Sequence, residues 1–369
     1  TPAKDWVNWD LEYNDWKKTG FDIQASLQFY RFKHEEWKTP EQSAFNYAAA
    51  FASHFGSREG NGLICTIEAG NEPWEYPADI YQKILKGTVK GVKTTDPDIE
   101  VFPCALQAAD PEMEKTPIFK NYIGARINAD MAGQLDGVNS HVYSYVTGLD
   151  GKRKAVHPEH PLSTFWEINN MIRWRDQNMP GKKIYLSEWG WDHDGGGEDC
   201  THDVCVSEKA AAAYAIRGVL IAARLGIERT TWYFHNNVKG PSSLYMRSGL
   251  LSSADAGFQK KKSFIGLQSL INHLGDSYFL KIIKEDENGW IYLFGDKFGQ
   301  PTQVIGWLPI SGDSQKETLV HIDLNHKVKN SILLDADSPM GTKMPLPEKK
   351  PTGYMLKLSA QPTIFQLDN

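Results

Sequence analysis

A chain of 369 residues is long for one small domain and has room for a barrel of about 250 residues together with a smaller module. Its net charge of −6 and its scattered Lys and Arg residues provide no basic face, which disfavours nucleic acid as a partner. No stretch approaches the roughly 20 apolar residues of a membrane span, and no signal-like segment opens the chain.

Strand-like apolar runs alternate with amphipathic helices over the first three quarters of the chain. Such alternation is typical of a parallel sheet with crossover helices. The last of these helices is expected at 261–274 and ends at Gly275. The expected strands are 22–30, 63–72, 100–107, 136–145, 183–188 and 229–236.

After Gly275 the pattern changes to about seven short strand-like runs without helices, which predicts a β-sandwich. The segment 345–351 reads as a polar loop. We therefore expect a catalytic α/β domain at 1–276 and an accessory sandwich at 277–369.

Two carboxylates stand where expected strands end. Glu72 lies in the run Asn71-Glu72-Pro73-Trp74, directly after an apolar stretch, and Glu188 closes the run 183–188. The catalytic groups of a parallel barrel come from the carboxyl ends of different strands. Two acids so placed, with tryptophans beside them, favour a pair of carboxyls that acts on a sugar.

In these motifs the chain resembles the retaining glycoside hydrolases of clan A, the (β/α)8 superfamily of β-xylosidases, β-mannanases, cellulases and β-agarases. If 22–30 is the third barrel strand, Glu72 falls on the fourth and Glu188 on the seventh. The resemblance implies that Glu72 is the general acid/base, that Asn71 donates a hydrogen bond to the sugar 2-hydroxyl, and that Glu188 is the nucleophile.

The resemblance extends to a His-x-Tyr pattern, His141 and Tyr143, on the sixth strand. The alternation of a strand points both side chains the same way. The resemblance implies that Tyr143 orients Glu188 by hydrogen bonding. The implied fold is a (β/α)8 TIM-type barrel followed by a β-sandwich.

Further substrate-binding residues are expected beside the two acids. On the eighth strand, Trp232, Phe234 and Asn236 alternate with Tyr233 and His235; only one set can face the substrate, and the pattern leaves the choice open. Tryptophans next to the acids suit stacking on sugar rings. The candidates are Tyr30, Trp74, Trp189, Trp191, Trp232 and His235.

The strand count falls short of a closed barrel, which needs eight strands. Residues 1–21 are too few for two βα units and read as helical. We therefore expect the barrel to contain strands 3 to 8 here and an upstream segment or an associated N-terminal fragment to complete it, with an open sheet as the other possibility.

Several polar residues admit a structural as well as a functional interpretation. Glu68, four residues before Glu72, is expected to be an internal ion-pair partner. Cys200 and Cys205 are spaced for a small disulfide, which would place the protein in a secreted or periplasmic compartment. The acidic loop 192–199 could hold calcium but more often such runs are solvated. No metal and no cofactor are predicted.

The function that these features favour is a retaining glycosidase acting on a β-linked oligo- or polysaccharide. A non-catalytic carbohydrate-binding protein on a decayed barrel is a second hypothesis. A transglycosylase with the same machinery is a third, because transfer and hydrolysis share one covalent intermediate. The glycan, the linkage and the oligomeric state do not follow from the sequence.

Overall fold

A computed structural model describes residues 7–29, 33, 36–106, 127 and 129–368. The chain divides into two compact units. The first holds the described residues up to His141 together with Glu167–Ser187, and the second holds Val142–Trp166 and the residues from Glu188 onward. Among the described residues, none of the helices has the length and apolar character needed to cross a membrane.

The first unit is an α/β arrangement built on parallel strands. Strands β1, β2 and β3 pair in that order and run parallel, with Ala25 opposite Ile67 and Ile67 opposite Val101. Strand β4 pairs with β7, whose last two residues belong to the second unit. The elements are α1 (Trp9–Lys18), β1 (Ile23–Ser26), α2 (Pro40–Phe55), β2 (Ile64–Ala69), η2 (Pro73–Glu75), α3 (Ala78–Thr95), β3 (Glu100–Pro103), α5 (Ala129–Ala132), β4 (Gly137–His141), α6 (Ile168–Asn178) and β7 (Lys183–Trp189).

Helices α2 and α3 cover this unit and pack closely against each other. Two glycines on α3, one turn apart, make the approach possible. A Cβ on Gly87 would lie 2.2 Å from the Glu41 carbonyl oxygen, and one on Gly91 would lie 2.5 Å from that of Phe45. Any larger residue at either position would push the helices apart, because backbone atoms cannot yield as a side chain does.

The second unit contains the rest of the α/β region and the sandwich. Its Tyr233 N–H donates to the Trp189 carbonyl at 2.8 Å, so the residues after β8 continue the ladder of β7. The α/β elements of this unit are β5 (Tyr145–Thr147), β6 (Arg153–Ala155), η5 (Thr164–Glu167, whose last residue belongs to the first unit), α7 (Glu208–Arg224), β8 (Arg229–Trp232), η6 (Ala254–Ala256) and α8 (Lys262–Leu274).

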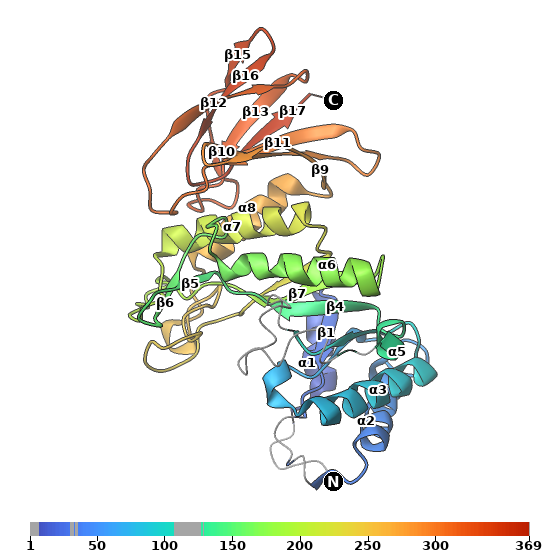
Figure 1. Cartoon of the computed structure of the whole chain (residues 1–369). Helices are drawn as coiled ribbons and strands as arrows, with labels where there is room; N and C mark the ends of the chain where they lie inside the picture. The colour runs from blue at the N-terminus through green and yellow to red at the C-terminus, as the bar shows by residue number, and fades with distance from the viewer. Residues whose placement is uncertain (1–6, 30–32, 34–35, 107–126, 128, 369) are drawn as a thin grey trace. The chain divides into compact units, whose positions relative to one another are not determined.

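Two antiparallel sheets follow α8 and form the sandwich, drawn in orange and red in Figure 1. One has the order β14-β13-β17-β11-β10-β9 and the other β12-β16-β15. Apolar residues of both sheets, including Ile291, Val304 and Leu356, make a common core. The strands are β9 (Tyr278–Asp286), β10 (Gly289–Gly295), β11 (Pro301–Trp307), β12 (Thr318–Asp323), β13 (Val328–Leu333), β14 (Thr342–Lys343), β15 (Glu348–Lys350), β16 (Gly353–Leu358) and β17 (Thr363–Leu367).

The strand predictions succeed in position and fail in detail. A strand starts within each of the six expected α/β ranges, although β1, β3 and β8 are only four residues long and β7 runs one residue past its range. The prediction that Tyr143 shares a strand with His141 is wrong, because β4 ends at His141. The predicted polar loop 345–351 is wrong in part, because its residues Glu348–Lys350 pair with β16 as strand β15. The sheets in the described part of the chain do not close into a ring, so a complete barrel stays a prediction.

A buried ion pair between α7 and Glu159 also receives a hydrogen bond from the sandwich, all within the second unit. Arg217 of α7 and Glu159 are both buried; Arg217 Nε donates to Glu159 Oε1 at 2.7 Å, and Trp307 Nε1 donates to the same oxygen at 2.7 Å. Burial alone would raise the pKa of Glu159, but the Arg217 charge and its hydrogen bonds lower that pKa to about 2. The carboxylate is therefore charged and joins an α/β helix to strand β11.

Candidate active site

Glu72 stands on a rigid turn at the carboxyl end of β2. The strand ends at Ala69, and Gly70 turns the chain with φ at +108°, a conformation that L side chains rarely adopt. Glu72 then caps the short helix η2. The Glu75 carboxylate accepts from the Glu72 N–H at 3.3 Å and from Asn71 Nδ2 at 3.0 Å. Asn71 and Glu72 are thus both held by Glu75.

Glu75 is a residue that the sequence reasoning missed. The signal was present, because a glutamate three residues after a capping residue, with proline at the first helical position, is a capping-box pattern. Its consequence for the site is positional: it limits how far Asn71 and the backbone of Glu72 can move.

His141 lies against the Glu72 carboxylate inside the first unit. Its Nδ1 is 3.0 Å from Glu72 Oε1, and its Nε2 is 4.0 Å from Glu68 Oε1. The side chains of His141 and Glu68 are 7% and 6% exposed, so this pairing is shielded from water. Glu68 also accepts from Gln24 Nε2 at 3.1 Å. Glu68 thus takes the internal position predicted for it, with His141 between two glutamates.

Glu188 lies near the end of β7 in the second unit. Hydrogen bonds from Tyr143 and Val142 hold it. Tyr143 donates its hydroxyl to Glu188 Oε2 at 2.8 Å, the hydrogen bond that the resemblance implied. The Val142 N–H donates to the Glu188 carbonyl at 3.0 Å. Burial, followed by the Glu188 charge, raises the pKa of Tyr143 far above its ordinary value, so the phenol stays protonated and serves as a donor.

The rings of three tyrosines lie around Tyr143, and none of the three was among the predicted site residues. The Tyr245 ring lies 4.8 Å from that of Tyr143, and the Tyr233 ring lies 6.3 Å away at nearly a right angle. Tyr145 stacks on Tyr143 from within the same segment, at 6.2 Å. Tyr233 belongs to one of the two alternating sets on the eighth strand. Tyr245 carries no local sequence signal, because it lies in a loop 57 positions after Glu188.

The stacking role predicted for Trp189 and Trp191 is wrong. They are 2% and 3% exposed, so neither indole face is open to a sugar ring. Trp189 packs on α7 at Gly218, where a Cβ would lie 2.3 Å from the indole, and Trp191 donates Nε1 to the Val156 carbonyl at 3.0 Å. Both indoles belong to the interior, because they follow Glu188 in the sequence but pack against helix α7 in the structure.

The remaining predicted residues fall in different settings. Trp232 packs against Trp189 at 5.2 Å and donates Nε1 to the Ser248 carbonyl, which makes it a member of the same interior cluster. His235 is exposed, with Nδ1 3.1 Å from Asn236 Oδ1. Trp74 is 54% exposed and remains a candidate stacking platform. Tyr30 lies outside the described residues, as does residue 107 at the end of the third expected strand.

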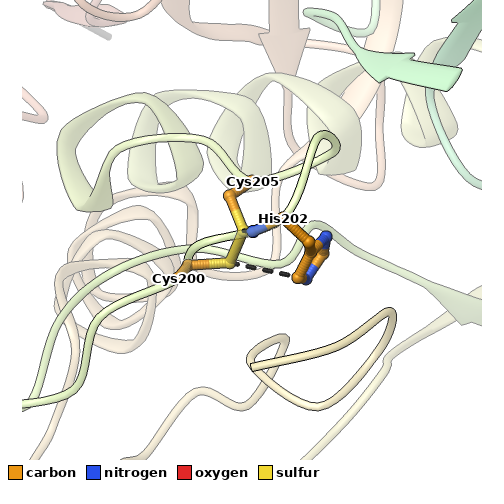
Figure 2. Close-up of side chains that lie close together, drawn as sticks. All are labelled: Cys200, His202 and Cys205. Atoms are coloured by element: carbon orange, nitrogen blue, oxygen red, sulfur yellow. Dashed lines mark hydrogen bonds between the residues drawn. A yellow bond between two sulfur atoms is a disulfide. The ribbon is translucent and has the colours of Figure 1, made fainter. Parts of the chain in front are cut away.

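Cys200 and Cys205 form the disulfide that their spacing predicted, with Cα atoms 5.6 Å apart (Figure 2). Their sulfur atoms are bonded to each other and cannot act as thiolate ligands, although together with His202 they would otherwise suit a metal ion. Of the other two cysteines, Cys104 is buried and Cys65 is partly exposed.

Carboxylates of the acidic loop 192–199 accept hydrogen bonds from backbone N–H groups. Asp194 accepts from the Cys200 N–H at 2.7 Å, and Glu198 accepts from the Ser253 N–H at 2.7 Å. Behind the loop, the buried ammonium of Lys261 donates to two carbonyls, and burial lowers its pKa to about 7. The carboxylates of the loop therefore have hydrogen-bond donors from the protein itself, which favours a structural loop over a calcium site.

Known proteins resemble this chain in structure rather than in sequence. No protein-family model matches it, and no curated protein matches it in sequence. A family 39 glycoside hydrolase from the gut symbiont Bacteroides cellulosilyticus WH2 superposes with a TM-score of 0.72 at 16% identity, over 100% of this chain and 72% of that one.

Two further solved structures carry the same similarity. A GH30 endoxylanase from Clostridium papyrosolvens C71 has a TM-score of 0.57 at 12% identity, over 99% of this chain and 85% of that one. A family 51 α-L-arabinofuranosidase from Bifidobacterium longum has a TM-score of 0.61 at 14% identity, over 97% of this chain and 78% of that one. At these identities the similarity establishes a shared fold, an α/β region followed by a β-sandwich.

Proposed function

We propose that this protein is a retaining glycosidase that hydrolyses a β-linked oligo- or polysaccharide through a covalent glycosyl-enzyme intermediate. Glycoside hydrolases of several families share its fold, which supports the general class. These enzymes act on different substrates, from xylan to arabinofuranosides, so the fold does not select a glycan. The assignment of roles rests on the contacts of the two acids.

The observation that carries the proposal is the different partner of each acid. His141 and Tyr143 are separated by one residue, and His141 contacts Glu72 while Tyr143 donates to Glu188. A retaining mechanism needs one carboxyl that exchanges a proton and one that stays ionised, about 5 Å apart. An imidazole can exchange a proton with a neighbouring carboxyl, whereas the Tyr143 phenol stays protonated and donates a hydrogen bond to Glu188, which favours the charged form of that carboxyl.

In the first step of the proposed reaction, a carboxylate oxygen of Glu188 attacks the anomeric carbon. The bond from that carbon to the glycosidic oxygen breaks, and the leaving oxygen takes the proton of Glu72. The sugar is then bound to Glu188 as an ester. Asn71, held by Glu75, is assigned the hydrogen bond to the sugar 2-hydroxyl.

In the second step, Glu72 acts as a base and removes a proton from water. The water oxygen attacks the anomeric carbon and displaces the Glu188 carboxylate, which restores both groups to their starting states. Two displacements at one carbon return the β configuration. With a sugar hydroxyl in place of water, the same step would be transglycosylation.

The test is a screen for released reducing sugar over β-xylan, β-glucan, β-mannan, xyloglucan and agarose, with the anomeric form of the first product read by proton NMR. Early release of the β anomer supports the proposal, and early release of the α anomer contradicts retention. An added acceptor sugar separates hydrolysis from transfer. Binding to a glycan without any turnover would instead favour the carbohydrate-binding alternative.

We further propose a secreted or periplasmic location, because a disulfide such as Cys200–Cys205 persists in oxidising compartments and is rare in a reducing cytosol. Thiol titration of the protein, isolated under denaturing and alkylating conditions from its native source, tests this: labelling of both cysteines would contradict it.

A further inference from the structure

A buried carboxylate, Asp192, fixes a loop that follows β8 in the second unit. Its Oδ2 accepts from the Tyr245 N–H at 2.6 Å, and its Oδ1 accepts from the Arg247 N–H at 2.8 Å. Asp192 is only 4% exposed. A carboxylate removed from water needs such donors, so neither backbone group can leave without a large free-energy cost.

The third partner of Asp192 comes from the disulfide loop. His202 lies between Cys200 and Cys205 in the sequence, and its Nε2 is 3.4 Å from Asp192 Oδ2. Figure 2 shows the His202 ring beside the disulfide, with Nε2 3.6 Å from the Cys200 sulfur. The His202 N–H also donates to the Cys205 sulfur at 3.3 Å. The disulfide therefore holds the imidazole in reach of Asp192.

Tyr245 adopts a backbone conformation that it would rarely choose by itself. Its φ is +66°, in the left-handed region that is unusual for a bulky side chain. Such a conformation persists where surrounding contacts determine it, and here the bond to Asp192 does so. The result is the placement of the Tyr245 ring 4.8 Å from the Tyr143 ring.

We propose that Asp192 and Tyr245 are positioning residues for Glu188: Asp192 sets the backbone of Tyr245, and the Tyr245 ring holds Tyr143 in the rotamer that donates to Glu188. This rests on the proposed role of Glu188 as nucleophile. A nucleophile must lie close to its line of attack, and a shift of about 1 Å caused by a remote change can cost roughly 100-fold in rate. The Cys200–Cys205 disulfide supports the arrangement through His202.

The variants that test the proposal are Tyr245→Ala, Tyr245→Phe and Asp192→Asn, with Leu244→Ala as a matched control. Leu244 is the neighbour of Tyr245 in the same loop and is 41% exposed. The probes are 2,4-dinitrophenyl β-glycosides of xylose, glucose, galactose and mannose, together with the polysaccharides of the screen above. Thermal unfolding and near-ultraviolet circular dichroism of each variant measure the folded fraction.

We expect Tyr245→Ala to lower kcat/KM by about 10- to 100-fold, mainly through kcat, and equally on aryl glycosides and polysaccharides. Tyr245→Phe should stay within about threefold of wild type, because it keeps the ring. Asp192→Asn should lower kcat by about 10-fold, since its amide group must turn a donor toward one of the two N–H groups. Leu244→Ala should match wild type.

A rise in KM without a change in kcat in Tyr245→Ala would overturn the proposal and assign Tyr245 to substrate contact. Wild-type activity in folded Tyr245→Ala would also overturn it. A Cys200→Ser/Cys205→Ser variant should lose activity as Asp192→Asn does; full activity there would remove the disulfide from the arrangement. Failure of the proposed function is distinct: it would show as an inactive wild type, or as a Glu188→Gln variant that still turns over substrate.

Discussion

The surroundings of Glu72 and Glu188 differ in kind. Glu72 has a titratable partner, His141, with a second glutamate, Glu68, on the far side of the imidazole. Glu188 has a phenol, Tyr143, which sits among other tyrosines and whose pKa is strongly raised. One carboxyl has an imidazole as its neighbour, and the other has a phenol that stays protonated and donates a hydrogen bond to it.

This difference matches the two roles of a double displacement. The acid/base must lose a proton in the first step and regain one in the second, so a titratable neighbour is useful to it. The nucleophile must remain an anion, and a fixed hydroxyl donor favours the charged form. Under the proposed mechanism, the partners of the two acids would set their different roles, because the two side chains are chemically identical. Four experiments can break or sharpen it.

The largest effect is expected for Glu188→Gln. An amide cannot attack the anomeric carbon, so kcat should fall by roughly 10⁴-fold or more on every substrate. Steady-state rates on polysaccharide and on 2,4-dinitrophenyl glycosides measure this, with circular dichroism to show that the fold is kept. Near-wild-type turnover would remove Glu188 from the mechanism and end the comparison.

Glu72→Gln should produce a loss that depends on the leaving group. A poor leaving group needs the proton, so polysaccharide turnover should fall by about 10²- to 10⁴-fold. With a dinitrophenolate leaving group, formation of the intermediate needs no proton, and its rate, measured as a pre-steady-state burst, should change far less. Equal losses on both substrates in that first step would contradict the acid role.

Tyr143→Phe should lower kcat/KM by roughly 100-fold, because one hydrogen-bond donor to the nucleophile is lost. The loss should be the same for good and poor leaving groups, unlike that of Glu72→Gln, since Tyr143 acts on the attacking carboxylate. Tyr47→Phe, a change at a ring that is 52% exposed, is the matched control. A leaving-group dependence in Tyr143→Phe would mean that the phenol serves the acid instead.

The smallest effect is expected for Glu68→Gln. Glu68 acts on Glu72 only through His141, so we expect a loss of about 3- to 10-fold on polysaccharide and almost none in the burst with dinitrophenyl glycosides. If Glu68→Gln reduced both rates alike while the variant stayed folded, Glu68 would not act through the proton-transfer step. The contrast between the two acids would then be reduced to their direct partners.

Much of the fold was accessible from local patterns. The alternation of apolar residues located the six α/β strands, and the loss of helical spacing after Gly275 located the sandwich. These features depend on which residues face inward within one element, and that is decided by neighbours in the sequence. Strand β15 was missed because Glu348–Lys350 is charged and has no apolar alternation. It is a strand only because it pairs with β16.

Within the candidate site, the sequence by itself determined where the two acids stand and that His141 belongs to the strand now seen as β4, whereas Tyr143 lies two residues beyond the end of that strand. The spacing of Cys200 and Cys205 was compatible with the disulfide that they form, since a short loop can bring two cysteines together without help from the rest of the fold. Each of these statements concerns residues that are close in the chain.

Only the tertiary structure decided which aromatic rings meet. Trp189 and Trp191 flank Glu188 in sequence and are buried against α7, whereas Tyr245 lies far along the chain and packs against Tyr143. Asp192 and Tyr245 are joined by a hydrogen bond across 53 positions, as Glu159 and Trp307 are across 148. Such contacts follow from how elements pack once they have formed, and packing carries no periodic signal in one sequence.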